Sequence, residues 1–150
     1  MKCDNMIILN STDSDVLREL YIDAFIDVSS DRYIHTIKNM TECTDGWCYT
    51  GYLWDCLKKP RLITERRLNQ FVQKRKGIYI MWDIHSKDYI KIPNYWKYPK
   101  DSVIHLEEWS KELVKTMPED IYVFDDTFNW SAIYTHEDIN SHRYCLFTTQ

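Results

Sequence analysis

The last third of the chain holds three short segments with strand periodicity, and their close spacing is the feature that most constrains the fold. The segments cover residues 121–124, 129–135 and 143–147. Polar residues typical of turns separate them, at 125–128 and 136–142. These connections are too short for the crossover that joins parallel strands. The sequence therefore predicts a mainly antiparallel sheet.

Upstream of these strands the apolar pattern alternates between the helical and the extended period. Residues 78–84 and 89–92 read as a further strand pair around a turn at 85–88, which gives about five strands. Helical spacing covers residues 12–28, where Thr12 and Asp15 resemble a capping box, and residues 64–76, with Gly77 as the expected C′ residue directly after the helix. It also covers 104–116. Shorter helices are expected at 31–40 and late in 47–57, with a strand at 46–49 as the alternative. The predicted class is α+β, with three or four helices packed on one face of the sheet.

Composition excludes several functional classes. The chain has 150 residues, typical of a single globular domain, which we place at 1–150. It holds only three glycines, and neither glycine-rich phosphate-binding motif occurs, so we expect no nucleotide and no other cofactor. No run of apolar residues is long enough for a signal peptide or a membrane span. A cytoplasmic location without a membrane partner is expected.

The five cysteines are odd in number, and free thiols are the expected state in a chain without a secretion signal. The best metal-binding pattern is Cys43-x4-Cys48-x7-Cys56. It lacks the close CxxC pairing that places two thiolates on one turn, so we expect no zinc site.

Charge is segregated along the chain. Residues 1–60 carry a net charge of −4, residues 61–100 carry +7, and residues 101–150 carry −7. The basic segment contains Arg66, Arg67, Lys74, Arg75 and Lys76, which makes nucleic-acid binding one alternative. The acidic segments favour a basic protein partner, because complementary charge accelerates association and selects partners.

Aromatic residues make up 15% of the chain, and some are expected to serve an interface. We expect an acidic and aromatic binding surface made of six residues: Trp96, Tyr98, Asp125, Asp126, Glu137 and Asp138. Asp125 and Asp126 are also the residues that a hairpin turn favours, and we prefer that role to cation binding.

One constellation offers an enzymatic alternative. His136 is followed by Glu137 and Asp138, and a carboxylate near an imidazole can fix its tautomer and raise its basicity. Cys145, which follows in the next predicted strand, is the candidate nucleophile. A small hydrolase-like or transferase-like enzyme at His136, Glu137 and Cys145 is thus the alternative, although no catalytic motif occurs.

Two patches carry a resemblance to a known family. Residues 47–54 read WCYTGYLW, and residues 121–137 read IYVFDDTFNWSAIYTHE. Together they resemble an uncharacterised family of small cytoplasmic proteins from Gram-positive bacteria, known as a domain of unknown function. The resemblance implies a bacterial source and a compact α+β domain. In general character the chain is similar to immunity proteins, so the expected function is a non-enzymatic module that neutralises a cognate toxin, such as a basic toxin domain, by binding it.

Overall fold

A computed structural model describes residues 6–86 and 98–150. It shows an α+β fold around a seven-stranded sheet in which every adjacent pair is antiparallel. The strands, in sheet order, are β1 (Met6–Ile8), β6 (Ile104–Glu108), β5 (Lys76–Trp82), β7 (Ile121–Asp125), β8 (Trp130–Ile139), β9 (His142–Thr149) and β4 (Arg61–Ile63). A separate hairpin is formed by β2 (Thr41–Cys43) and β3 (Gly46–Cys48). The predicted class and the antiparallel pairing are confirmed, with seven strands in the main sheet.

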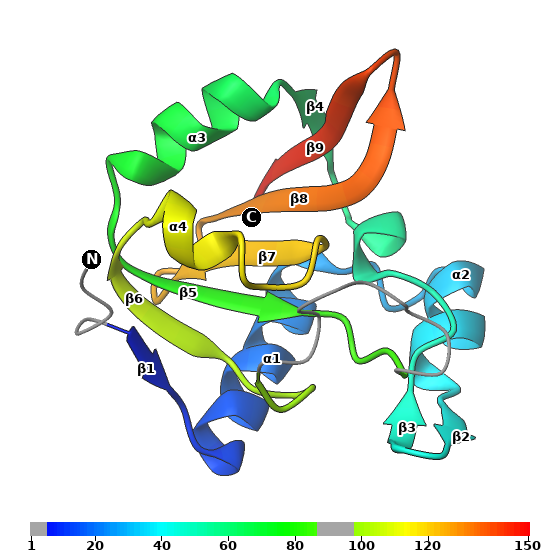
Figure 1. The fold of residues 1–150 in the computed structure, drawn as a ribbon. Helices are drawn as coiled ribbons and strands as arrows, with labels where there is room; N and C mark the ends of the chain where they lie inside the picture. Colours follow the sequence, from blue (N-terminus) through cyan, green and yellow to red (C-terminus); the bar gives the residue numbers. More distant parts are fainter. Residues whose placement is uncertain (1–5, 87–97) are drawn as a thin grey trace.

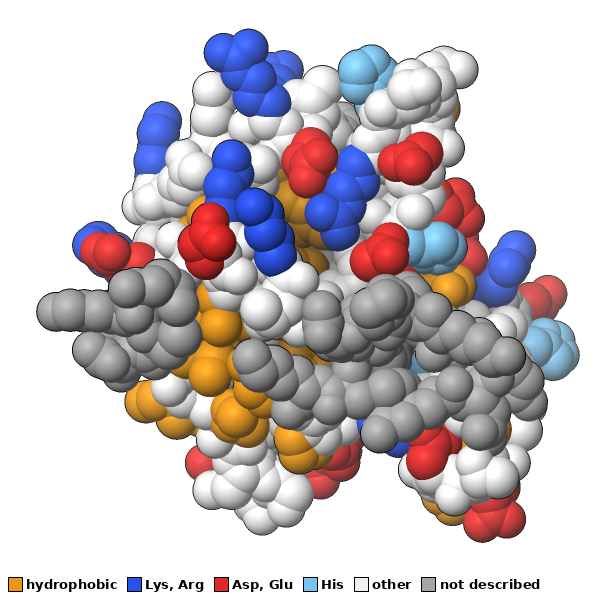
Figure 2. All heavy atoms as spheres, viewed as in Figure 1, with side chains coloured by type: hydrophobic (Ala, Val, Ile, Leu, Met, Phe, Trp, Pro, Cys, Tyr) orange, Lys and Arg blue, Asp and Glu red, His pale blue; other side chains and the backbone are white. Residues whose placement is uncertain are grey.

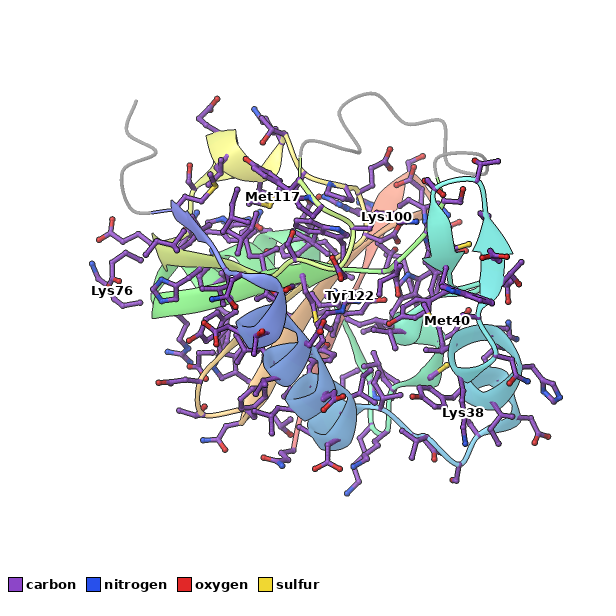
Figure 3. The ribbon with its side chains drawn as sticks, turned by 90° about the horizontal axis from the view of Figure 1, so that it is seen from below. Lys38, Met40, Lys76, Lys100, Met117 and Tyr122 are labelled. Atoms are coloured by element: carbon purple, nitrogen blue, oxygen red, sulfur yellow. The ribbon has the colours of Figure 1, made fainter. Side chains whose placement is uncertain are left out.

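The helices cover both faces of the sheet, so the prediction of a single covered face is wrong (Figure 1). On one face lies α1 (Ser11–Phe25), whose Tyr21 and Phe25 pack with Tyr122 and Phe124 of β7. On the other lie α3 (Glu65–Gln73) and α4 (Lys111–Val114), which pack with Ile121 and Val123. All four β7 residues are fully buried, because alternate side chains of a strand point to opposite faces. Figure 3 shows α1 lying across the near side of the sheet, with Tyr122 beside it.

The remaining helical segments lie at one end of the sheet. They are α2 (Asp31–Tyr33), which continues into the π-helical turn η1 (Ile34–Lys38), and the 3-10 helix η2 (Leu53–Cys56). Both confirm predicted helices, and β3 matches the strand that was the alternative at 46–49. Trp54 and Leu57 are buried, as expected.

Three local predictions need correction. Residues 104–108 form a strand and not the start of a helix, because Ile104 and Leu106 alternate with His105 along β6 and belong to the same buried core as the apolar residues of the neighbouring strand β5. The cap of α1 is Asn10, whose side chain accepts from the Asp13 N–H at 2.8 Å. Gly77 lies within β5 with φ +65°, and α3 ends earlier, at Gln73, with Lys74 as its C-cap. The predicted strand 89–92 lies outside the described residues. Within residues 6–86 and 98–150, no helix is long and apolar enough to cross a membrane.

Candidate functional site

Tyr52 is the centre of an aromatic cluster where η2 meets the ends of the strands. Its ring stacks on Trp54 with centroids 5.1 Å apart, and it contacts the rings of His85 at 4.7 Å and His136 at 5.2 Å. Trp54 in turn makes an edge contact with Tyr144 at 5.8 Å. These residues come from four separate segments of the chain. We call the cluster, with the carboxylates around it, the acidic–aromatic site; it comprises Tyr52, Trp54, Asp55, Asp83, His85, Asp120, His136, Glu137 and Tyr144.

The buried carboxylate of Asp120 holds the His136 ring in place by hydrogen bonds. Nδ1 of His136 lies 3.0 Å from each carboxylate oxygen of Asp120, and the His136 backbone N–H donates to Oδ1 at 3.0 Å. The Trp54 indole N–H donates to the same oxygen at 3.1 Å. Only 9% of the Asp120 side chain is exposed, against 35% of the His136 side chain. Because an ionised carboxylate only accepts hydrogen bonds, Nδ1 carries a hydrogen and a neutral ring keeps Nε2 as an acceptor.

Asp83 fixes the backbone that presents the aromatic rings. It accepts from the Leu53 N–H at 2.8 Å and from the Tyr122 hydroxyl at 2.7 Å, and that hydroxyl accepts from the Trp54 N–H at 2.9 Å. The first N–H groups of a helix have no partners within it, so these bonds satisfy the start of η2. Burial raises the pKa of Asp83 from 3.8 to about 6, while His85 and the two hydrogen bonds oppose that rise.

The exposed rim of the site is acidic. Burial raises the pKa of the Tyr52 hydroxyl to about 12, with further contributions from the carboxylates of Asp120, Asp83, Glu137 and Asp55. Burial, Asp55 and Glu137 also raise the pKa of Tyr144. Two exposed carboxylates, those of Asp55 and Glu137, thus contribute negative charge around these half-buried rings, and Asp55 also lies 3.7 Å from the guanidinium of Arg32. Such an arrangement attracts a cationic side chain through both charge and ring faces.

The predicted acidic surface is divided between the two ends of β8. Asp125 and Asp126 lie at the turn before this strand, whereas Glu137 and Asp138 lie near its far end. Seven residues separate Trp130, at the start of β8, from Glu137, so at about 3.3 Å per residue the two pairs lie roughly 20–25 Å apart. Asp125 accepts from the Thr127 N–H at 3.0 Å and the Trp130 indole N–H at 2.9 Å, which supports the turn role. Of the four, Glu137 belongs to the acidic–aromatic site.

Of the two predicted aromatic anchors, the structure describes Tyr98, which does not belong to the acidic–aromatic site. Tyr98 is half-buried, with its ring 6.1 Å from Trp82 and its hydroxyl 3.6 Å from the Met6 sulfur. Trp96 lies outside the described residues.

The predicted nucleophile is separated from His136. Cys145 is only 1% exposed and packs with Tyr134 in the core on the α3 side of the sheet. Burial raises the pKa of its thiol to about 12. His136 instead contacts Tyr52 and Trp54, which pack in the core on the α1 side. The prediction of an enzyme site that combines Cys145 with His136 and Glu137 is therefore wrong.

The basic segment lines an open groove. The groove, about 950 Å³ in volume, lies between α3 and the β8–β9 hairpin, and its wall includes the exposed Leu62 and Ile139. Arg66 and Arg67 of α3 are exposed there, whereas Arg143 is bound to Glu65 at 3.3 Å. Figure 2 shows cationic side chains interspersed with acidic ones around this part of the surface. Elsewhere, Lys76 is paired with Glu108 and Arg75 lies over the Phe71 ring. Nucleic-acid binding stays a prediction.

Sequence reasoning missed Tyr52, Asp83, His85 and Asp120. Asp120 reads locally as a polar residue before a strand, and its partners Trp54 and His136 are 66 and 16 residues away. Within the described parts of the chain, no group of three or more His, Cys, Asp or Glu side chains could hold a metal ion.

Comparison with known protein families, with curated proteins and with solved structures found no match. The resemblance of residues 47–54 and 121–137 to an uncharacterised family thus stays a prediction.

Proposed function

We propose that this protein is a non-enzymatic binding module that presents the acidic–aromatic site to a basic protein. The observation that carries the proposal is the acidic environment of the half-buried Tyr52 and Tyr144, to which the exposed Asp55 and Glu137 both contribute, on a frame fixed by buried hydrogen bonds. The partner that we propose is the basic protein that the sequence predicts. The binding surface that we propose lies at the end of the sheet next to η2, and no longer includes Asp125, Asp126 and Asp138.

Two physical features support a binding role for this surface. Tyr52 and Trp54 stack on one another, and η2 is tied to Asp83, Asp120 and Tyr122, so little side-chain freedom remains to be lost on association. Aromatic residues with charged neighbours are also typical of binding hot spots. An immunity-type protein that neutralises a toxin is the concrete form of the proposal, with an arginine- or lysine-rich toxin surface as the partner.

The test is co-expression with the product of the adjacent gene, followed by purification of any complex and titration at low and high salt. Reversing two charges, with Asp55→Arg and Glu137→Arg together, is expected to weaken binding at least about tenfold, or 1.4 kcal/mol. The control carries the same changes at exposed positions outside the site, Asp15→Arg and Asp126→Arg. Equal affinity in both double variants contradicts this surface, and the absence of a stoichiometric complex with the wild-type chain contradicts the toxin-neutralising form.

The His136–Asp120 pair favours one alternative, an enzyme in which His136 acts as a general base through Nε2. It retains the hydrolase-like or transferase-like class without Cys145. Hydrolysis of p-nitrophenyl acetate above the uncatalysed rate tests it. The rate should fall to background in His136→Gln and stay unchanged in His142→Gln, which alters an exposed histidine of β9. A wild-type rate equal to background contradicts this alternative for that substrate class.

A further inference from the structure

Two cysteines face each other across the β2–β3 hairpin. The sulfur atoms of Cys43 and Cys48 are 2.8 Å apart, and both residues are free thiols. A disulfide has a sulfur–sulfur distance of about 2.05 Å, so a further approach of roughly 0.8 Å would allow the bond to form.

The hairpin geometry explains this proximity. Cys43 pairs in register with Gly46 and Thr41 pairs with Cys48, so the two cysteines are diagonal neighbours on adjacent strands. Diagonal Cα atoms are usually about 7–8 Å apart, but the strong twist of a two-stranded ribbon shortens one of the two diagonals. Gly46 adopts φ +109° at the turn, a conformation that favours glycine, and it brings the strands together directly beside Cys43.

The surroundings hold the hairpin in this arrangement. The turn residue Asp45 accepts from the Ser86 hydroxyl at 2.8 Å and forms an ion pair with Lys100 at 3.4 Å. The Tyr49 N–H, directly after β3, donates to the Ile84 carbonyl at 2.7 Å. Figure 3 shows Lys100 next to the hairpin. Both strands are thus attached to the body of the protein at the turn and at the far end of β3.

The geometry points to a reversible redox site at which Cys43 and Cys48 form an intramolecular disulfide, with a low-molecular-weight disulfide such as oxidised glutathione as the oxidant. Cys43 is half-buried whereas Cys48 is fully buried, so the Cys43 thiolate attacks first. It forms a mixed disulfide and releases one glutathione thiolate. The Cys48 thiolate then attacks the Cys43 sulfur and displaces the second glutathione. Two protein thiols are oxidised, one glutathione disulfide is reduced, and the two protons pass to the released glutathione.

This chemistry reaches beyond the proposed binding function and is independent of it. The disulfide would fix the hairpin that presents Trp47, a tryptophan with 57% of its surface exposed. It also differs from a zinc site at Cys43, Cys48 and Cys56, because Cys56 is buried in the core with its thiol directed to the Tyr52 carbonyl at 3.8 Å.

The test incubates the full-length chain with excess glutathione disulfide, alkylates the remaining thiols and digests without reduction. Cleavage after Trp47 separates the two cysteines, so a disulfide appears as two linked fragments that dithiothreitol releases. Wild type and Cys56→Ser should both give this linked pair. Cys48→Ala should instead keep glutathione on Cys43. This result would show that the Cys43 thiol still reacts with glutathione disulfide when Cys48 is absent.

Three results would overturn the inference: alkylation of both cysteines in the wild-type chain after oxidant treatment, glutathione retained on Cys43 while Cys48 stays free, or linkage of Cys43 to another cysteine. Circular dichroism of each variant separates these results from misfolding.

Discussion

The imidazole of His136 and the carboxylate of Asp120 form a pair in which Nδ1 lies 3.0 Å from each carboxylate oxygen. The same carboxylate accepts from the His136 backbone N–H and from the Trp54 indole N–H. A single side chain therefore links η2, the segment before β7, and β8. Its removal should affect the whole acidic–aromatic site.

Asp120→Leu should destabilise the protein by about 2–5 kcal/mol, because partly buried donors of Trp54 and His136 lose their acceptor. Asp120→Asn keeps one oxygen and should cost about 1 kcal/mol. Urea unfolding followed by tryptophan fluorescence measures both. Glu119→Leu, which removes an exposed neighbouring carboxylate, is the control and should change the free energy of unfolding by less than about 0.5 kcal/mol. Similar losses for Asp120→Leu and Glu119→Leu would contradict the role of Asp120.

Asp83 should make stability fall as the pH rises from about 4 to about 6. Its pKa is raised from 3.8 to about 6 by burial, so the folded state binds more protons than the unfolded state within this window. At about 1.4 kcal/mol per pKa unit, Asp83→Asn should gain roughly 3 kcal/mol relative to wild type across the window, with no further gain at higher pH. Urea unfolding at several pH values measures the difference. Asp126→Asn, at an exposed position, is the control, and a constant gap between Asp83→Asn and wild type would refute the assignment.

Leu68 should be essential to the second covered face of the sheet. It belongs to α3 and its side chain is fully buried against the sheet, so Leu68→Ala should cost about 2–5 kcal/mol through lost burial and the cavity left behind. Leu62→Ala makes the same chemical change where the side chain is 69% exposed, and it should cost less than about 0.5 kcal/mol. Chemical denaturation of both variants gives the comparison. Equal costs would mean that α3 does not cover the sheet as described.

The start of α1 should depend on Asn10 and not on Thr12. The Asn10 side chain accepts from the Asp13 N–H at 2.8 Å, so Asn10→Ala should cost about 1 kcal/mol. Thr12 lies inside the first turn and its side chain is exposed, so Thr12→Ala should change stability by less than about 0.5 kcal/mol. Thermal unfolding at matched concentration compares them. The opposite order would restore the capping box that the sequence predicts at Thr12 and Asp15.

Local sequence was sufficient for many elements because their signals are short-ranged. Thr64 begins α3 as predicted, since a threonine hydroxyl can accept from the N–H three residues later. The β7–β8 turn was also predicted, because Asp125 satisfies donors two and five residues away. The start of β6 was not, because Ile104, Leu106 and the residues that follow fit both periods until β5 is placed beside them.

The sequence by itself determined the α+β class, the antiparallel pairing and most element positions, because each follows from hydrophobic period, turn residues and connection length. Only the tertiary structure decided that helices cover both faces of the sheet and that Glu137 and Asp126 lie far apart. It alone brought Asp120 to His136 and Trp54, across 16 and 66 residues of sequence. Such convergence depends on which distant segments share a core, and that balance of burial and hydrogen bonding leaves no local pattern along the chain.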